Sequence, residues 1–278
     1  MIELIRTEIP SLFPLDSDPG RLRVMNEPLE EYLQGLFARV AKGARWKLEF
    51  VPDPELAAQL AGVAEFTVRD GDETVGSRGN GGKEFQFSGV HIRYPWDILV
   101  LNERLIARLD KPEIAGEVSP AAHVEGVIRL GEGSRILPGV FIEGNAVIGK
   151  NCKIGPNCYI RGNTVIGDNC HIGQAVEVKN SVIGFKTAVG HLSYVGDSVL
   201  GDHVNFGAGT IIGNLRHDGK NHRSLVDGTL VDTGRRKFGA IVGDDVHTGI
   251  HTAIYPGRKL APGSSTRPGD VVQLDLVD

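Results

Sequence analysis

Residues 136–178 read ILPGVFIEGNAVIGKNCKIGPNCYIRGNTVIGDNCHIGQAVEV, with an aliphatic side chain at every sixth position from Ile136 to Val178. The pattern starts upstream and continues downstream, where two steps, Val178 to Ile183 and Val195 to Leu200, are five residues long. A period of six fits neither an α-helix, at about 3.6 residues per turn, nor a simple alternating strand. The full ladder is Val118, Val124, Leu130, Ile136, Ile142, Ile148, Ile154, Ile160, Ile166, Ile172, Val178, Ile183, Val189, Val195, Leu200, Phe206 and Ile212, followed by a second run at Val242, Thr248, Ile254, Leu260, Thr266 and Val272.

The other positions of the repeat fit a triangular coil of short strands and corners. Glycine often follows the aliphatic residue, where a corner needs permissive backbone angles, and a small or β-branched residue stands four positions after it. Stacked coils then supply each other's hydrogen-bond partners. Cys152, Cys158 and Cys170 all occupy the small-residue position, so we expect them to pack inside the prism as free thiols, without a metal or disulfide role.

The chain divides into two predicted domains, joined near Lys111-Pro112. Residues 1–110 predict a small α/β unit, and residues 111–278 the prism. In the first unit, an apolar stripe from Leu29 to Val40 predicts a helix with Asn26 as its cap, and Pro95 to Asp110 predicts a second helix. Three strands are predicted in KLEFV, EFTVRD and KEFQFSGV.

Residues 213–241 interrupt the ladder with a polar, basic segment that contains NLRHDGKNHRS and VDTGRRKFGA. Long insertions in a regular solenoid usually form loops on the functional face. We therefore expect this insertion to lie beside the functional site.

Composition narrows the classes of partner. The formal net charge is −5, without the basic excess that nucleic acid or an anionic membrane surface would require. The longest apolar runs are far shorter than the roughly 18 residues of a membrane span, and the N-terminus lacks the apolar core of a secretory signal. The sequence predicts a cytoplasmic protein that binds neither nucleic acid nor membrane.

The repeats resemble the hexapeptide-repeat transferases, whose prism is a left-handed parallel β-helix. Residues 177–211, EVKNSVIGFKTAVGHLSYVGDSVLGDHVNFGAGTI, closely resemble the acetyltransferase half of the bifunctional enzymes that make UDP-N-acetylglucosamine. The two five-residue steps fall at corresponding places, and NLRHDGK followed by VDTGRRKFGAIVGDD resembles the archaeal-type branch. The resemblance implies transfer of an acetyl group from acetyl-CoA to an amino-sugar phosphate such as glucosamine-1-phosphate, without a metal, in a homotrimer.

Site residues follow from the same resemblance. A histidine, which ordinarily titrates at about pH 6.5, suits the removal of a proton from an attacking amine. His191, in GHLSY, matches the family's catalytic base, and Asn214 matches an asparagine near the site of acetyl transfer. The positions that match substrate-binding residues, or that lie in the inserted loop beside them, are Arg161, Lys179, Tyr194, Asn205, Lys220 and Lys237. Ala208 matches a backbone contact to acetyl-CoA, and Arg258 and Lys259 are further candidates for the coenzyme A phosphates.

The sequence departs from the better-known bacterial pattern in two places. Leu215 stands where a tyrosine is expected and Ile250 where a serine is common. Residues 1–110 contain no G-x-G-T-R loop to hold nucleotide phosphates, so we expect no uridylyl transfer from this chain.

Two other functions compete with the acetyltransferase hypothesis. The prism is also the scaffold of γ-class carbonic anhydrases, and His217 with His222, or His247 with His251, has a spacing that zinc ligands use. Alternatively, the chain is a non-catalytic sugar-binding or structural module, which the altered cofactor positions favour.

Overall fold

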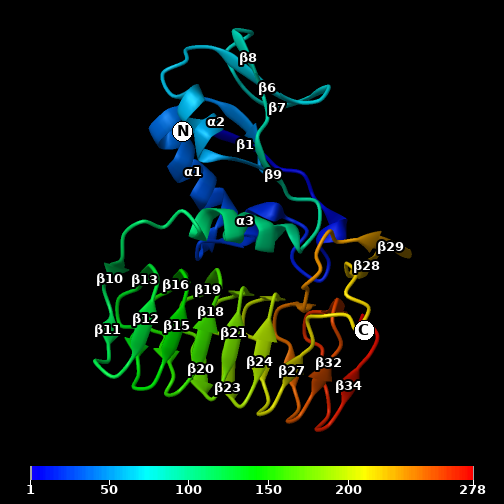
Figure 1. Cartoon of the computed structure of the whole chain (residues 1–278). Coiled ribbons are helices and arrows are strands. Elements are labelled where there is room, and N and C mark those ends of the chain that lie inside the picture. The colour runs from blue at the N-terminus through cyan, green and yellow to red at the C-terminus, as the bar shows by residue number, and fades with distance from the viewer. Residues whose placement is uncertain (1, 278) are drawn as a thin grey trace.

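The structure is a computed structural model that describes residues 2–277. An α/β unit at the N-terminus sits on one face of a triangular prism, with helix α3 (Asp97–Ile106) lying along that face (Figure 1). The fold class predicted from the sequence, a left-handed parallel β-helix with a small N-terminal α/β unit, is confirmed.

The prism has three faces, each a sheet of parallel strands. Over residues 2–277 these faces hold eight, seven and eight strands. Face 1 consists of β10 (Glu113–Ile114), β13 (Ile128–Leu130), β16 (Ala146–Ile148), β19 (Thr164–Ile166), β22 (Val182–Ile183), β25 (Val199–Leu200), β30 (Ala240–Val242) and β33 (Arg258–Leu260). Face 2 consists of β11 (Glu117–Val118), β14 (Arg135–Ile136), β17 (Lys153–Ile154), β20 (His171–Gln174), β23 (Ala188–His191), β26 (Asn205–Phe206) and β31 (His247–Thr248). Face 3 consists of β12 (His123–Glu125), β15 (Phe141–Glu143), β18 (Tyr159–Arg161), β21 (Glu177–Lys179), β24 (Tyr194–Gly196), β27 (Ile211–Ile212), β32 (Ala253–Ile254) and β34 (Val271–Val272).

The aliphatic ladder fills the prism, as the period predicts. Ile142, Ile160 and Val178 are consecutive partners in register on face 3 and are fully buried. Cys152, Cys158 and Cys170 are buried free thiols in the same core, which confirms their predicted structural place. Burial raises the pKa of Cys158 to about 12.

Corners repeatedly use the left-handed region of backbone space, in which asparagine is more tolerated than most residues. Non-glycine corner residues with φ between 47° and 59° recur at the ladder spacing, at Asn151, Asn157, Asn169, Ala175, Asn180, Lys186, Leu192, Asp197 and His203.

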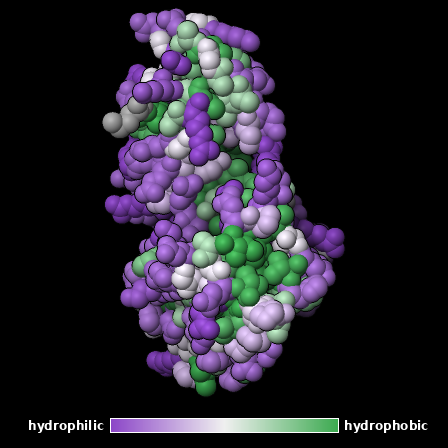
Figure 2. All heavy atoms as spheres, turned by 90° about the vertical axis from the view of Figure 1, so that its left-hand side faces the viewer, coloured by the Kyte–Doolittle hydropathy of each residue, from purple (hydrophilic) through white to green (hydrophobic). Residues whose placement is uncertain are grey.

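The end of the prism that begins with β10, β11 and β12 presents apolar atoms to the surface (Figure 2). Ile114 is 54% exposed there, and Val118 and Val124 are only partly buried. Glutamates on the three edge strands, Glu113, Glu117 and Glu125, place charge beside this end. Charge on an edge strand opposes pairing with another chain.

The N-terminal unit contains a mixed sheet in the order β1 (Glu3–Ile5), β4 (Arg45–Lys47), β7 (Glu73–Arg78), β6 (Phe66–Asp70) and β8 (Lys83–Gln86). Two smaller pairs are β2 (Arg23–Val24) with β3 (Glu27–Pro28), and β5 (Phe50–Pro52) with β9 (Gly89–His91). Helices α1 (Leu29–Val40) and α2 (Pro54–Leu60) complete it, with short 3-10 turns at Pro10–Leu12 and Pro19–Arg21.

Several predicted details of this unit were wrong. Asn26 does not cap α1, because its side chain donates instead to Asp168 of the prism at 2.8 Å. KLEFV divides between β4 and β5, and α3 is shorter than the predicted Pro95–Asp110 segment.

The outward side chains of face 1 belong to the core of the N-terminal unit. Val147, Val165, Val182 and Val199 pack in one cluster with Ile98 of α3. Each fully buried side chain of this size contributes about 1.5–3 kcal/mol relative to an exposed one, so the two units are joined by a hydrophobic interface. The predicted boundary at Lys111-Pro112 falls between the end of α3 and β10.

No helix among residues 2–277 is long and apolar enough to span a membrane.

Candidate functional site

The irregularities of the ladder gather at one edge of the prism, where face 3 leads into face 1; we call this the 3–1 edge. The two five-residue steps are the connections from β21 to β22 and from β24 to β25. The next connection at this edge, from β27 to β30, is the insertion 213–241. Two shortened corners and the long insertion therefore stack in three consecutive coils.

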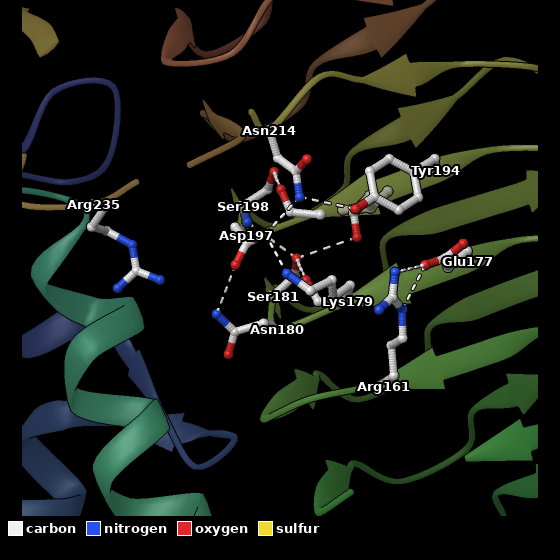
Figure 3. A network of polar contacts seen from close by, with 12 residues as sticks. Arg161, Glu177, Lys179, Asn180, Ser181, Tyr194, Asp197, Ser198, Asn214 and Arg235 are labelled. Atoms are coloured by element: carbon white, nitrogen blue, oxygen red, sulfur yellow. Dashed lines mark hydrogen bonds and ion pairs between the residues drawn. The ribbon is translucent and has the colours of Figure 1, made fainter. Parts of the chain in front are cut away.

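A buried carboxylate lies at the centre of the 3–1 edge. The Asp197 side chain is 4% exposed, and Lys179 Nζ lies 2.9 Å from its Oδ2. Asn214 also donates to Oδ2, at 2.6 Å, and Asn180 donates to Oδ1 at 3.0 Å. Figure 3 shows these side chains converging on Asp197. Three donors compensate for the burial of this charge.

Tyr194 joins this network from face 3. Asn214 Nδ2 donates to its hydroxyl at 2.9 Å. Burial, followed by the charge of Asp197, raises the pKa of Tyr194, so the phenol stays protonated at neutral pH. On the same face, Glu177 lies one coil before Tyr194 and Arg161 lies two coils before it, and these two side chains pair at 2.7 Å.

Gly196 makes room for the contact between Tyr194 and Asn214. A Cβ at Gly196 would lie 2.4 Å from the Tyr194 hydroxyl and 2.7 Å from Asn214 Nδ2. The glycine is therefore required by the close approach of these two side chains.

His191 lies at the end of β23, at the edge where face 2 leads into face 3. This edge is on the other side of face 3 from the 3–1 edge, and the His191 side chain is exposed. Ala208 lies in the next coil, because the neighbouring Gly209 N–H donates to His191 O at 3.1 Å. Gly207 N–H is also used, by Thr248 O at 3.1 Å. Within residues 2–277, the Ala208 N–H donates no hydrogen bond.

His191 contributes to lowering the pKa of a second histidine on face 2, His171. Burial, together with the charges of Lys153 and His191, lowers the pKa of His171. Asn205 is exposed on the same face, in register with Ala188 of β23.

The structure thus brings together Lys179, Tyr194 and Asn214 at the 3–1 edge, and His191 and Ala208 at the edge between faces 2 and 3. Lys220 is exposed in the insertion and lines a hollow with Arg216 and Arg223. Lys237 is exposed where the insertion returns to the prism, paired with Leu215 through a single antiparallel bridge.

The two basic candidates for the coenzyme A phosphates lie elsewhere. Arg258 pairs with Asp275 at 3.4 Å, and Lys259 is 3% exposed, with its ammonium donating to Leu225 O at 2.8 Å. Burial lowers the pKa of Lys259. Lys259 therefore holds the insertion against face 1 in this structure and is not presented to a cofactor.

The histidines of the zinc hypothesis are also dispersed. His222 is buried at 2% exposure, whereas His217, His247 and His251 are exposed. Within residues 2–277, no group of three or more histidine, cysteine, aspartate or glutamate side chains is placed to hold a metal ion.

Several members of the polar network were missed by the sequence prediction: Asp197, Asn180, Glu177, Glu103 and Arg235. The available signal was the position of the two five-residue steps and the insertion, all at the same corner of the triangular repeat. Glu103 carried no such signal, since its place depends on how α3 docks on face 1.

Comparison with known proteins agrees with the resemblance seen in the sequence. Residues 142–260 match a family model described as the GMPPB C-terminal domain. The chain is 41% identical over 193 residues to the bifunctional sugar-1-phosphate nucleotidylyltransferase/acetyltransferase of Sulfurisphaera tokodaii, covering 69% of this chain and 48% of that protein. It is 48% identical over 185 residues to the bifunctional protein GlmU of Methanococcus maripaludis, covering 66% and 44% respectively.

The predicted resemblance is confirmed. The chain spans about half the length of the curated relatives it matches. Among solved structures, the UDP-N-acetylglucosamine acyltransferase of Francisella novicida aligns with a TM-score of 0.35 at 15% identity, covering 57% of this chain and 63% of that one.

Proposed function

We propose that this protein is an acetyl-CoA-dependent N-acetyltransferase that acts on an amino-sugar phosphate, with His191 as general base. The observation that carries the proposal is the 41% identity to a sugar-1-phosphate nucleotidylyltransferase/acetyltransferase. The grouping of Lys179, Tyr194 and Asn214 at the insertion supports it.

His191 would act on the attacking amine. The amine nitrogen attacks the thioester carbonyl carbon, and His191 accepts the proton that this nitrogen loses. As the carbon–sulfur bond breaks, the imidazolium returns the proton to the departing thiolate. The free Ala208 N–H, one coil away, is suited to stabilise the oxyanion of the tetrahedral intermediate.

The basic side chains at the 3–1 edge would bind the sugar phosphate. Lys179 and Arg161 already face carboxylates, Asp197 and Glu177. A phosphate would share these cations through charge-assisted hydrogen bonds. Asn205, Lys220 and Lys237 are the further substrate contacts we propose, and a homotrimer, which light scattering would detect, is the proposed assembly.

The deciding experiment measures thiol release from acetyl-CoA with glucosamine-1-phosphate and galactosamine-1-phosphate as acceptors. We expect His191→Ala to lower turnover by about 10²–10⁴-fold, the usual contribution of a general base. His203→Ala is the matched control, because His203 is also an exposed corner histidine but is on another edge.

Two results would contradict the proposal. Turnover that survives His191→Ala would remove the assigned base. Saturable binding of the sugar phosphate without turnover by the unmodified protein would favour the non-catalytic sugar-binding alternative.

A further inference from the structure

Helix α3 of the N-terminal unit reaches the polar network of the 3–1 edge through Glu103. Asn180 Nδ2 donates to Glu103 Oε1 at 2.7 Å, and the same amide group donates to Asp197 Oδ1 at 3.0 Å. Asn180 is therefore shared between a carboxylate of the prism and a carboxylate of the N-terminal unit. It lies in the first of the two shortened corners, with φ of 47°.

Glu103 also binds the insertion. Arg235 donates to Glu103 Oε1 at 2.5 Å and to Oε2 at 3.3 Å, an ion pair that uses both carboxylate oxygens. The Arg235 side chain is 12% exposed and Glu103 is 30% exposed. Figure 3 shows Arg235 beside the α3 helix, next to Asn180 and Asp197. A bidentate arginine pair fixes orientation as well as distance.

The insertion returns to the prism directly after Arg235. Phe238 is fully buried and packs edge-on against Trp96, which precedes α3, with ring centroids 5.9 Å apart. Phe238 N–H donates to Asn214 O at 3.0 Å, and Gly239 N–H donates to Asp197 O at 2.9 Å. The segment that follows Arg235 is thus hydrogen-bonded to both Asn214 and Asp197.

We propose that Glu103 is a positioning residue of the sugar-phosphate site, so that the N-terminal unit forms part of that site. Glu103 holds Asn180 on one side and Arg235 on the other, and thereby sets the place of the insertion relative to Asp197, Lys179 and Asn214. The kinetic part of this inference rests on the proposed acetyl transfer, whereas its structural part does not.

The test compares Glu103→Gln and Glu103→Asp with Arg104→Gln, a control on the same helix. Arg104 contacts Asp53 and Gly89, both inside the N-terminal unit. Hydrogen exchange is measured separately over residues 213–241 and 142–166, and KM for the sugar phosphate separately from kcat.

We expect Glu103→Gln to accelerate exchange in residues 213–241 while residues 142–166 keep their protection. We also expect KM to rise about tenfold, as for the loss of one charge-assisted interaction, with kcat changed less than threefold. Glu103→Asp should restore part of the protection and reverse part of the rise in KM. Arg235→Gln should have the same effect on residues 213–241 as Glu103→Gln, and the variant with both substitutions should show no larger effect. Arg104→Gln should behave like the unmodified protein.

Unchanged exchange in residues 213–241 for Glu103→Gln would overturn the proposal. Faster exchange in both segments together would overturn it as well, because it would show general destabilisation. If the unmodified protein has no turnover, the proposed function fails, and the exchange result alone decides whether Glu103 positions the insertion.

Discussion

The regular coils and the insertion 213–241 are stabilised by different kinds of contact. In the coils, each strand pairs with one about 18 positions away, as Ile142 pairs with Ile160 and Ile160 with Val178. In the insertion, the local part is a small hairpin of β28 (Arg223–Val226) and β29 (Thr229–Asp232), and the anchors come from distant parts of the chain. A repeated local rule builds the prism, whereas the insertion depends on how two units dock.

The strongest test of this contrast removes one apolar side chain from each region. Ile160 is fully buried in the middle of the prism, whereas Leu230 is 53% exposed on the hairpin. Ile160→Ala leaves a cavity and should lower the free energy of unfolding by about 2–5 kcal/mol. Leu230→Ala should change it by no more than about 0.5 kcal/mol. Urea unfolding followed by circular dichroism measures both.

Comparable losses for the two variants would refute the contrast. That outcome would mean that the exposed hairpin contributes to the stability of the whole molecule as much as the prism interior does.

The sequence predicted the prism well because its rule is local. A side chain every sixth position specifies the strand, the interior slot and the corner together, so Cys152, Cys158 and Cys170 were placed correctly without any long-range information. The N-terminal unit has no such repetition. Asn26, expected to cap α1, instead binds Asp168 of the prism, a choice that only the docked structure reveals.

The residues of the candidate site differ in the same way: some could be predicted from local sequence and others could not. Lys179, Tyr194 and Asn214 were predicted because they match residues of the family that the sequence resembles. Asp197, to which Lys179 and Asn214 both bind, was missed because its role requires that two shortened corners stack. Arg235 needs a partner on α3, and no local pattern identifies contacts between the two units.

A second comparison concerns two glycines in equivalent places, each directly after an interior valine. A Cβ at Gly196 would overlap the Tyr194 hydroxyl and Asn214, whereas a Cβ at Gly190 would meet nothing within 4 Å. Gly196→Ala should cost about 1–3 kcal/mol of unfolding free energy, as for overpacking in general, and should weaken sugar-phosphate binding. Gly190→Ala should leave the stability unchanged.

Thermal unfolding and calorimetric titration with glucosamine-1-phosphate would compare the two variants. Equal behaviour of Gly196→Ala and Gly190→Ala would show that the contact between Tyr194 and Asn214 does not limit the site.

The smallest expected effect is a pH dependence confined to the insertion. His222 is 2% exposed, and its ring lies 6.3 Å from that of Phe238. Burial lowers the pKa of His222, and the charges of Arg216 and Arg258 lower it further, against opposing contributions from a hydrogen bond with the Asn214 backbone and from the charge of Asp218. The closed insertion therefore binds a proton less readily than an open one.

The sign of the effect follows from this difference in proton binding. Well above about pH 6.5, the ordinary pKa of histidine, His222 is neutral in both states and contributes no pH dependence. As the pH falls below that value, the open state takes up a proton first, and the closed insertion loses stability until the pH passes the lowered pKa. Hydrogen exchange over residues 213–241, corrected for intrinsic rates, should therefore be faster at pH 5.5 than at pH 7.5.

Two substitutions identify the group responsible. His222→Phe keeps the ring in place and removes the titration, so exchange in the insertion should lose its acid dependence. His217→Phe is the matched control, because His217 is an exposed histidine in the same segment and should leave the acid dependence intact. An acid dependence that persists in His222→Phe would assign it to another group. Residues 142–166 contain no histidine and provide the reference: if their exchange changes by the same factor, the pH acts on the whole molecule and the insertion has no separate stability.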